Sequence, residues 1–283
     1  MPNLRFVTDS FRILWSNKKS RMGLLITLFF VLLVTLGTLL LRPPEINASA
    51  IYQPPSWKHL LGTDYMGEDL LSMIAHGGGY ILEIALFTGV ISIGIGAVVG
   101  LSAGYFGRKV EGAITAITDV ALTIPGLILI IVLLQFVKTT NPIILAALIS
   151  VVAWAGFARA VKSQILVLRN QSFIEAAKML SLSRRHILFS ELLPNVMPYV
   201  AINFIFTVQS GLFVAVGLYY LGVLPYTSIN WGVMLNAAVS QGAFLSSVAL
   251  PSFIVPLAAI TLFTVGLILL SFGLDEVFNP RLR

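Results

Sequence analysis

Apolar residues in this chain gather into long runs that are separated by short polar segments. A helix that crosses the hydrocarbon core of a bilayer needs about 20 mainly apolar residues. Six runs reach that length, and they leave no segment large enough for a separate soluble domain. The pattern therefore predicts an all-α, polytopic membrane protein. The six predicted spans are residues 23–41, 81–103, 113–137, 142–161, 199–221 and 251–273.

The segment before the first span has an amphipathic pattern. Apolar residues such as Leu4, Val7 and Phe11 recur at helical spacing, and basic residues fall between them. This predicts an amphipathic helix within residues 1–22 on the cytoplasmic side. The helix either lies in the interface with its basic side toward lipid headgroups or packs against the bundle. We expect residues 23–283 to form one transmembrane domain.

Charge is sparse and unevenly distributed. The chain is 57% hydrophobic and 11% charged, which is unlike a soluble domain. With a cytoplasmic amino terminus, fifteen of the eighteen Lys and Arg residues lie on the inner side, and only Arg42, Lys58 and Lys138 lie outside. This bias predicts a protein of the plasma (inner) membrane with both termini and loop 162–198 in the cytoplasm. The net charge of +6 thus reflects topology, and no nucleic-acid partner is expected.

The sequence offers little catalytic chemistry. Cysteine is absent, which excludes disulfides and thiolate metal sites. There is no G-x-x-x-x-G-K-[ST] phosphate loop, and His59, His76 and His186 are scattered without metal-ligand spacing. We therefore expect no catalytic residue, no metal site and no cofactor in this chain. Any ATP and Mg²⁺ would be bound by another subunit.

Small and polar residues within the spans can be interpreted either as helix-packing residues or as residues with a role in transport. Gly96, Gly100 and Gly104 form a four-residue repeat, which favours close helix packing and is also compatible with a sliding surface. Ionisable residues in the spans are few, and neither Asp119 nor Glu83 lies at the midplane, where a charge is costly. The candidate pore-lining residues are Gln135, Asn203 and Gln209, although each could instead form an interhelical hydrogen bond.

The polar segment 172–194 must lie outside the hydrocarbon and is accessible to a soluble partner. Ser172 and Glu175 have capping-box spacing, which predicts a helix start. Ala176 and Ala177 have little bulk, so a partner could approach the backbone closely. We expect Ser183 to begin a second helix that Pro194 ends, because proline disfavours helical geometry at the residue before it. Arg184 and Arg185 lie at the start of this helix, where the positive end of the helix dipole disfavours basic residues. Their presence there would be explained by acidic groups of a partner that face them.

Glu175-Ala176-Ala177 followed by Leu193-Pro194 resembles the cytoplasmic loop of ABC-importer permeases, with Ser181 in place of a glycine and Glu191 in place of an isoleucine. Other segments are similar to the dipeptide/oligopeptide/nickel group of these permeases. They are 61–72, where Glu68 replaces an arginine, 103–107 with Asp119 and Pro125, 231–235, and 279–283, where Asn279 replaces an aspartate.

The resemblance implies a type I ABC-importer permease fold and a non-catalytic permease subunit. Its partners would be a second homologous permease, two cytoplasmic ATP-binding subunits and an extracytoplasmic solute-binding protein. The substrate would be a peptide, an oligosaccharide or a nickel chelate. The alternative is a secondary carrier or channel that needs no ATP, for which midplane carboxylates or an inverted repeat would be the sign. The implied ATPase-coupling residues are Glu175, Ala176, Ala177, Ser181, Ser183, Arg184 and Arg185.

Overall fold

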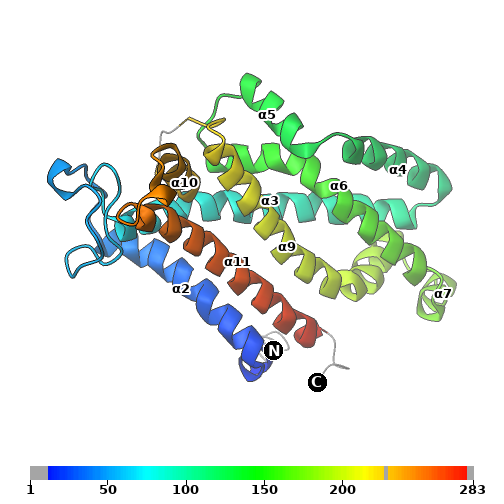
Figure 1. Ribbon diagram of the computed structural model, residues 1–283. Coiled ribbons are helices and arrows are strands. Elements are labelled where there is room, and N and C mark those ends of the chain that lie inside the picture. Colours follow the sequence, from blue (N-terminus) through cyan, green and yellow to red (C-terminus); the bar gives the residue numbers. More distant parts are fainter. Residues whose placement is uncertain (1–11, 226–228, 279–283) are drawn as a thin grey trace.

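The computed structural model describes residues 12–225 and 229–278, and within these ranges the regular elements are helices (Figure 1). This confirms the predicted all-α membrane fold. Five helices are long and apolar enough to cross a membrane. They are α2 (Lys18–Leu40), α3 (Leu70–Tyr105), α6 (Pro142–Leu168), α9 (Leu193–Tyr220) with the turns that precede it, and α11 (Leu250–Phe278).

The third predicted span is not a continuous helix. It is divided into α4 (Arg108–Thr123) and α5 (Gly126–Phe136), whose axes are bent by 85°. The cause is Pro125, because a proline ring disfavours helical geometry in the residue before it. Ile124 accordingly adopts an extended conformation with ψ 126°. The prediction of one unbroken helix over 113–137 is therefore wrong.

The glycine repeat of α3 packs against α6. Cβ atoms added at Gly96, Gly100 and Gly104 would meet Phe157, Val161 and Ile165 at 2.6–2.9 Å, in that order. Residue numbers along the line of contact rise in the same direction in α3 and in α6, so the two helices are parallel. The chain between them must therefore return to the other side of the membrane, which α4 and α5 together accomplish. With α4 and α5 counted as one bent span, the described residues give six candidate crossings.

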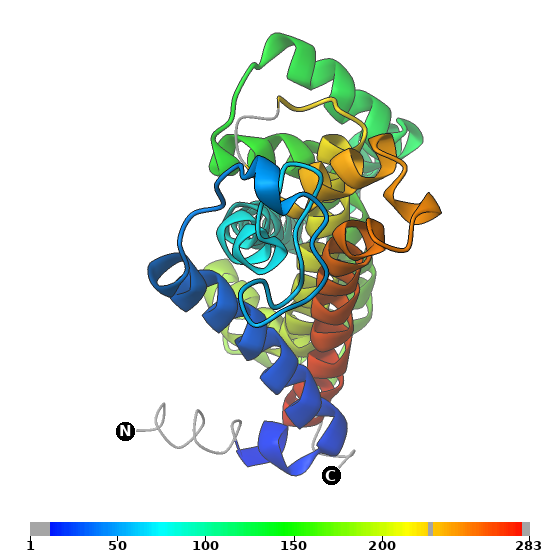
Figure 2. The same cartoon turned by 60° about the vertical axis from the view of Figure 1, so that its left-hand side comes forward.

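Both described ends of the chain lie at one end of the bundle. Helices α2 and α11 run side by side in both views (Figures 1 and 2), and Asn17 at the start of α2 donates a hydrogen bond to Glu276 near the end of α11. Residues 1–11 of the predicted amphipathic helix and the motif 279–283 lie outside the described residues. Arg12 to Ser16 is helical, and α2 begins at Lys18, within the segment predicted to precede the first span.

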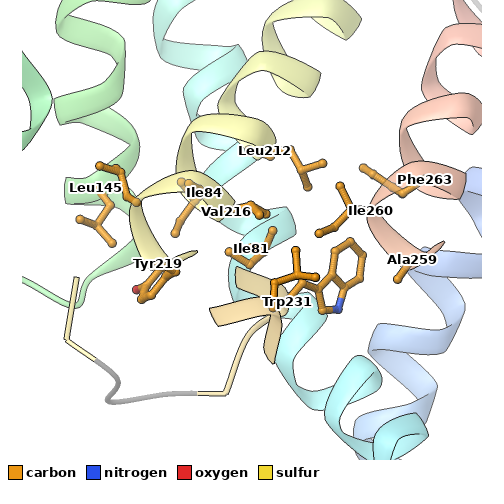
Figure 3. Close-up of a cluster of buried hydrophobic side chains, with 14 of the residues drawn as sticks. Ile81, Ile84, Leu145, Leu212, Val216, Tyr219, Trp231, Ala259, Ile260 and Phe263 are labelled. Atoms are coloured by element: carbon orange, nitrogen blue, oxygen red, sulfur yellow. The ribbon is translucent and has the colours of Figure 1, made fainter. Parts of the chain in front are cut away.

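The main hydrophobic core lies in the half of the bundle opposite the termini. Trp231, the first residue of α10 (Trp231–Ser240), is fully buried there (Figure 3). Its indole N–H donates to the carbonyl of Ile74 at 3.1 Å, and its ring packs against Phe30 and Phe263. The next residue is a glycine in close contact with α9, since a Cβ at Gly232 would lie 2.7 Å from the Val216 carbonyl oxygen.

An ordered loop, residues 41–69, covers the end of the bundle opposite α7 and contains two neighbouring carboxyl groups. Asp64 is buried, and its Oδ1 accepts hydrogen bonds from the N–H groups of Met66 and Glu68, each at 2.9 Å. Burial raises the pKa of Asp64, although these hydrogen bonds oppose the shift. Burial and the Asp64 charge raise the pKa of Glu68.

These raised pKa values predict a loop that is more stable in acid than at neutral pH. The folded loop binds protons more tightly than the unfolded chain, so its stability is largest below the unfolded pKa values and falls as pH rises through the folded ones. Glu68→Gln removes one of two like charges and should stabilise the loop at neutral pH by about 0.5 kcal/mol. Limited proteolysis of the loop at neutral pH and at about pH 5 measures both effects. An equal cleavage rate at the two pH values would contradict this prediction.

Candidate functional site

A helical hairpin projects from the bundle at the end opposite loop 41–69 (Figure 1). Its first arm is α7 (Ser172–Met179), which begins at the predicted residue. The predicted capping box is wrong, because the N-cap is Gln171 and no side chain caps the helix. Ser172 already lies in the first turn, so its hydroxyl does not face the free N–H groups. Glu175 is exposed at the surface of this arm.

Helix α7 ends in a Schellman motif centred on Ser181. The N–H of Leu182 donates to the carbonyl of Ala177 at 3.1 Å, and the N–H of Ser181 donates to that of Lys178 at 2.9 Å. Ser181 has φ 54°, in the left-handed region. The turn is therefore the one that glycine favours, and serine adopts it at a steric cost of about 1 kcal/mol.

Ser181→Gly should stabilise the hairpin by about 1 kcal/mol, because glycine adopts a positive φ without a Cβ clash. Hydrogen exchange of the amides in residues 172–183 would measure the effect. Ser183→Gly is the matched control, since Ser183 has φ −61° and its hydroxyl caps the next helix, so this change should destabilise the hairpin. Faster exchange in Ser181→Gly than in the unmodified chain would contradict the assigned strain.

The second arm is continuous with the fifth crossing. Ser183 caps α8 (Arg184–His186), as predicted, by accepting the N–H of His186 at 3.2 Å. A π-helical segment, η2 (Ile187–Leu192), then leads directly into α9. Much of segment 162–198 is therefore helical, because α6 reaches Leu168, α7 follows and the second arm begins at Arg184.

Pro194 does not end this helix, contrary to the sequence-based prediction. Leu193 is helical, with φ −57° and ψ −46°, and its N–H donates to the carbonyl of Leu188, five residues back. A proline ring inside a regular α-helix clashes with the carbonyl four residues earlier. The wider π turn directly before Pro194 gives the ring room, so the helix continues.

The hairpin packs onto the ends of three long helices through a second hydrophobic core. Ile174 and Ala177 of α7 are buried there, against Ile187 and Leu192 of the second arm and Val161 of α6. Ala177 is 5% exposed, whereas Ala176 is exposed. Of the two alanines predicted to permit close approach, only Ala176 therefore presents its methyl group to a partner.

The outer face of the hairpin is partly apolar, which sequence reasoning missed. Met179 and Leu180 are 84% and 74% exposed. They directly follow Lys178 in a charged segment. Two consecutive apolar residues in such a segment were the signal in the sequence that could have indicated an apolar surface here. Arg184 and Arg185 are exposed, and neither forms an ion pair with another described residue. We define the hairpin surface as Glu175, Ala176, Met179, Leu180, Arg184 and Arg185.

The candidate pore-lining residues do not gather around one site. Gln135 is exposed on α5 and lines a cavity of about 610 Å³ with Lys138 and Thr139. Asn203 is half-buried on α9 and donates to the carbonyl of Tyr199 on its own helix at 2.8 Å. Gln209 is half-buried two turns further along the same helix. The hydrogen bond of Asn203 within its own helix favours a structural role for this side chain. A pore-lining role for Gln135, Asn203 and Gln209 stays a prediction.

Helices long and apolar enough to cross a membrane, with an exposed hairpin packed on one end of the bundle, define an integral membrane protein. The chain belongs to the family described as binding-protein-dependent transport system inner membrane component, which matches residues 96–283. It is an ABC-importer permease, as the loop motif indicated, and the secondary-carrier alternative is not supported.

The chain is similar over most of its length to named permeases. It is 30% identical to the dipeptide transport system permease protein DppC of Bacillus subtilis, over 100% of this chain and 88% of that protein. It is also 30% identical to a putative peptide permease protein of Brucella suis, with coverages of 91% and 85%. The oligopeptide transport system permease protein OppC of Mycobacterium bovis is 30% identical, with coverages of 84% and 81%.

A solved structure shows the same fold. The inward-facing MetNI methionine ABC transporter contains a chain that matches 75% of this one and 97% of its own length. The TM-score is 0.56 at 21% sequence identity. This likeness concerns the arrangement of helices and supports the predicted type I permease fold.

Proposed function

We propose that this chain forms one half of the translocation pathway of an ATP-driven importer of short peptides, and that the hairpin surface receives the movement of a cytoplasmic ATPase. A second homologous permease would complete the pathway. Two ATP-binding subunits and an extracytoplasmic solute-binding protein would complete the importer. ATP and Mg²⁺ would bind to the ATPase subunits, and both termini of this chain would be cytoplasmic.

The observation that carries the coupling proposal is the shared core beneath the hairpin. Side chains of α3, α6, α7, η2 and α9 contribute to it, including Leu101, Ile165 and Val196. Protein interiors are close-packed, so a displaced hairpin displaces the helix ends packed against it. A partner that moves α7 would therefore move three membrane-crossing helices together.

The chemistry of the hairpin surface fits a soluble partner with an apolar pocket and acidic margins. Met179 and Leu180 would fill the pocket, and Ala176 would allow close backbone approach. Arg184 and Arg185 would meet acidic groups, and Glu175 would meet a basic or polar group of the partner. Ser181 and Ser183 would hold the two arms at a fixed angle and would not contact the partner themselves.

Short peptides are the proposed substrate class because the relatives cited above are named as dipeptide, oligopeptide or peptide permeases. Oligosaccharides and nickel chelates, which the resemblance left open, have no support from these relatives. Gln135 would lie along the substrate path, since it lines a cavity at the outer end of α5.

The test is uptake by the reconstituted importer in liposomes, with the second permease, the ATPases and the binding protein present. We expect ATP-dependent uptake of labelled dipeptides or tripeptides, and no uptake of an oligosaccharide or a nickel chelate. Peptide uptake without ATP by this chain alone would refute the ATP-driven assignment. ATP-dependent uptake of only the oligosaccharide or the nickel chelate would refute the substrate class.

A further inference from the structure

A cavity of about 690 Å³ lies between α4 and α6, at the end of the bundle where α3 finishes. Arg108, Lys162 and Arg169 contribute its positive charges, and Glu111 and Asp119 contribute its negative charges. Nothing in the proposed transport role uses this cavity. It lies on the polar face of α4, whereas Ile117 and Val120 are exposed elsewhere on that helix.

The cavity has an excess of cations without carboxylate partners. Asp119 is already paired with Arg159. Lys162 donates to the hydroxyl of Thr115 at 2.9 Å, and Arg169 donates to the carbonyl of Gly104 at 3.0 Å. Neither Lys162, Arg169 nor Arg108 forms an ion pair with any residue in the described ranges. Three cationic groups therefore line the cavity without forming an ion pair with its carboxylates, Glu111 and Asp119.

The position of the cavity along the bundle corresponds to the headgroup level of a bilayer. Helix α3 ends in Tyr105, which forms an edge-on aromatic pair with Phe106, and the basic residues begin at Arg108, three positions after Tyr105. Aromatic side chains are enriched at the membrane–water interface, and basic residues beyond them face lipid phosphates. Helix α4 also begins at Arg108 without a side-chain cap, so its first N–H groups add positive potential.

We propose that this cavity binds the phosphate group of an anionic phospholipid, with Arg108, Lys162 and Arg169 as its ligands. Arg169 is the C-cap of α6, three residues before α7 begins, and it already contacts the end of α3. A bound phosphate would therefore join the start of α4 to the base of the hairpin. Anionic lipid would stabilise the joint on which the proposed coupling depends.

The experiment measures binding of labelled phosphatidylglycerol and phosphatidylcholine to the purified permease complex in neutral detergent micelles. We expect saturable binding of phosphatidylglycerol and at least tenfold weaker binding of phosphatidylcholine. Arg108→Gln and Lys162→Gln should each weaken phosphatidylglycerol binding about tenfold, because each removes a charge-assisted contact. Lys109→Gln is the matched control, since Lys109 is adjacent and exposed but does not line the cavity.

Two results would overturn this assignment. Equal phosphatidylglycerol binding by Arg108→Gln, Lys162→Gln and Lys109→Gln would show that the cavity is not the site. Competition by inorganic phosphate at the same concentration as the lipid would identify an aqueous phosphate source instead. Arg108 is exposed, so its substitution should leave folding intact and keep the test decisive. The peptide uptake assay is independent of this result, so failure of one proposal does not imply failure of the other.

Discussion

Replacing Gly100 with valine is expected to prevent accumulation of folded protein in the membrane. A Cβ at this position would lie 2.6 Å from the carbonyl oxygen of Ala158 and 2.7 Å from the Cβ of Val161. The carbonyl belongs to the backbone of α6 and cannot rotate away, so the helices would have to separate. Separation would also loosen the second hydrophobic core beneath the hairpin. We expect a loss of at least about 3 kcal/mol, the upper end for overpacking.

Gly94→Val in the same helix is the matched control. A Cβ added at Gly94 would meet nothing within 4 Å, and the residue is exposed. The two variants make the same change in volume and local helix preference, and only Gly100 faces α6. Membrane expression and size-exclusion profiles in detergent would compare them. Equal amounts of monodisperse protein from both variants would refute the close parallel packing of α3 and α6.

Leu180→Asp is expected to abolish co-purification of the ATPase and ATP-dependent uptake while leaving the permease folded. Leu180 is 74% exposed, so the folded permease loses little packing when it is replaced. A carboxylate within a desolvated apolar contact costs several kcal/mol, enough to reduce binding by more than a hundredfold. Co-purification from membranes, with the thermal stability of the permease as a second readout, would measure both effects.

Asn170→Asp is the control for added charge, because Asn170 is exposed at the base of the hairpin and outside the hairpin surface. Ala177→Leu provides a contrast. Ala177 is buried between the two arms, so added volume should destabilise the hairpin itself by about 1–3 kcal/mol. If Leu180→Asp binds the ATPase normally, the hairpin surface is not the docking element.

The sequence predicted the helices well because their length is set by the bilayer. Apolar runs marked the five long helices and the bent pair α4 and α5, and the glycine repeat marked a close contact between α3 and α6. Effects of proline were harder to predict. Pro125 and Pro194 both occur in apolar or helical patterns, yet the first breaks its helix and the second does not. The difference arises from the π turn of Ile187–Leu192, which depends on tertiary packing that a local pattern does not encode.

The hairpin was located correctly from its polarity and the start of α7, but its orientation was not predictable. Ile174 and Ala177 share the buried side of the amphipathic helix α7, whereas Met179 at its end and the C-cap Leu180 are apolar and exposed. Which side is buried depends on the fixed positions of α6 and α9. Ser181 stands where the resembling permeases have a glycine, so a turn at this position could be anticipated. In the structure the turn forms with Ser181 itself in the left-handed conformation.

The unbroken passage from the hairpin into α9 gives this permease a lever arm. The helical path from Arg184 to Tyr220 has 37 residues and is about 55 Å long at 1.5 Å per residue. A tilt of about 10° at the hairpin end would carry the far end by about 10 Å, more than the width of a peptide backbone. In the proposed coupling, movement of the far end would then follow movement of the hairpin, because the helical path continues through both Pro194 and Pro198. Spin labels on cysteines introduced at residues 184 and 220 should keep one separation through the ATP cycle, and a changing separation would reveal a hinge.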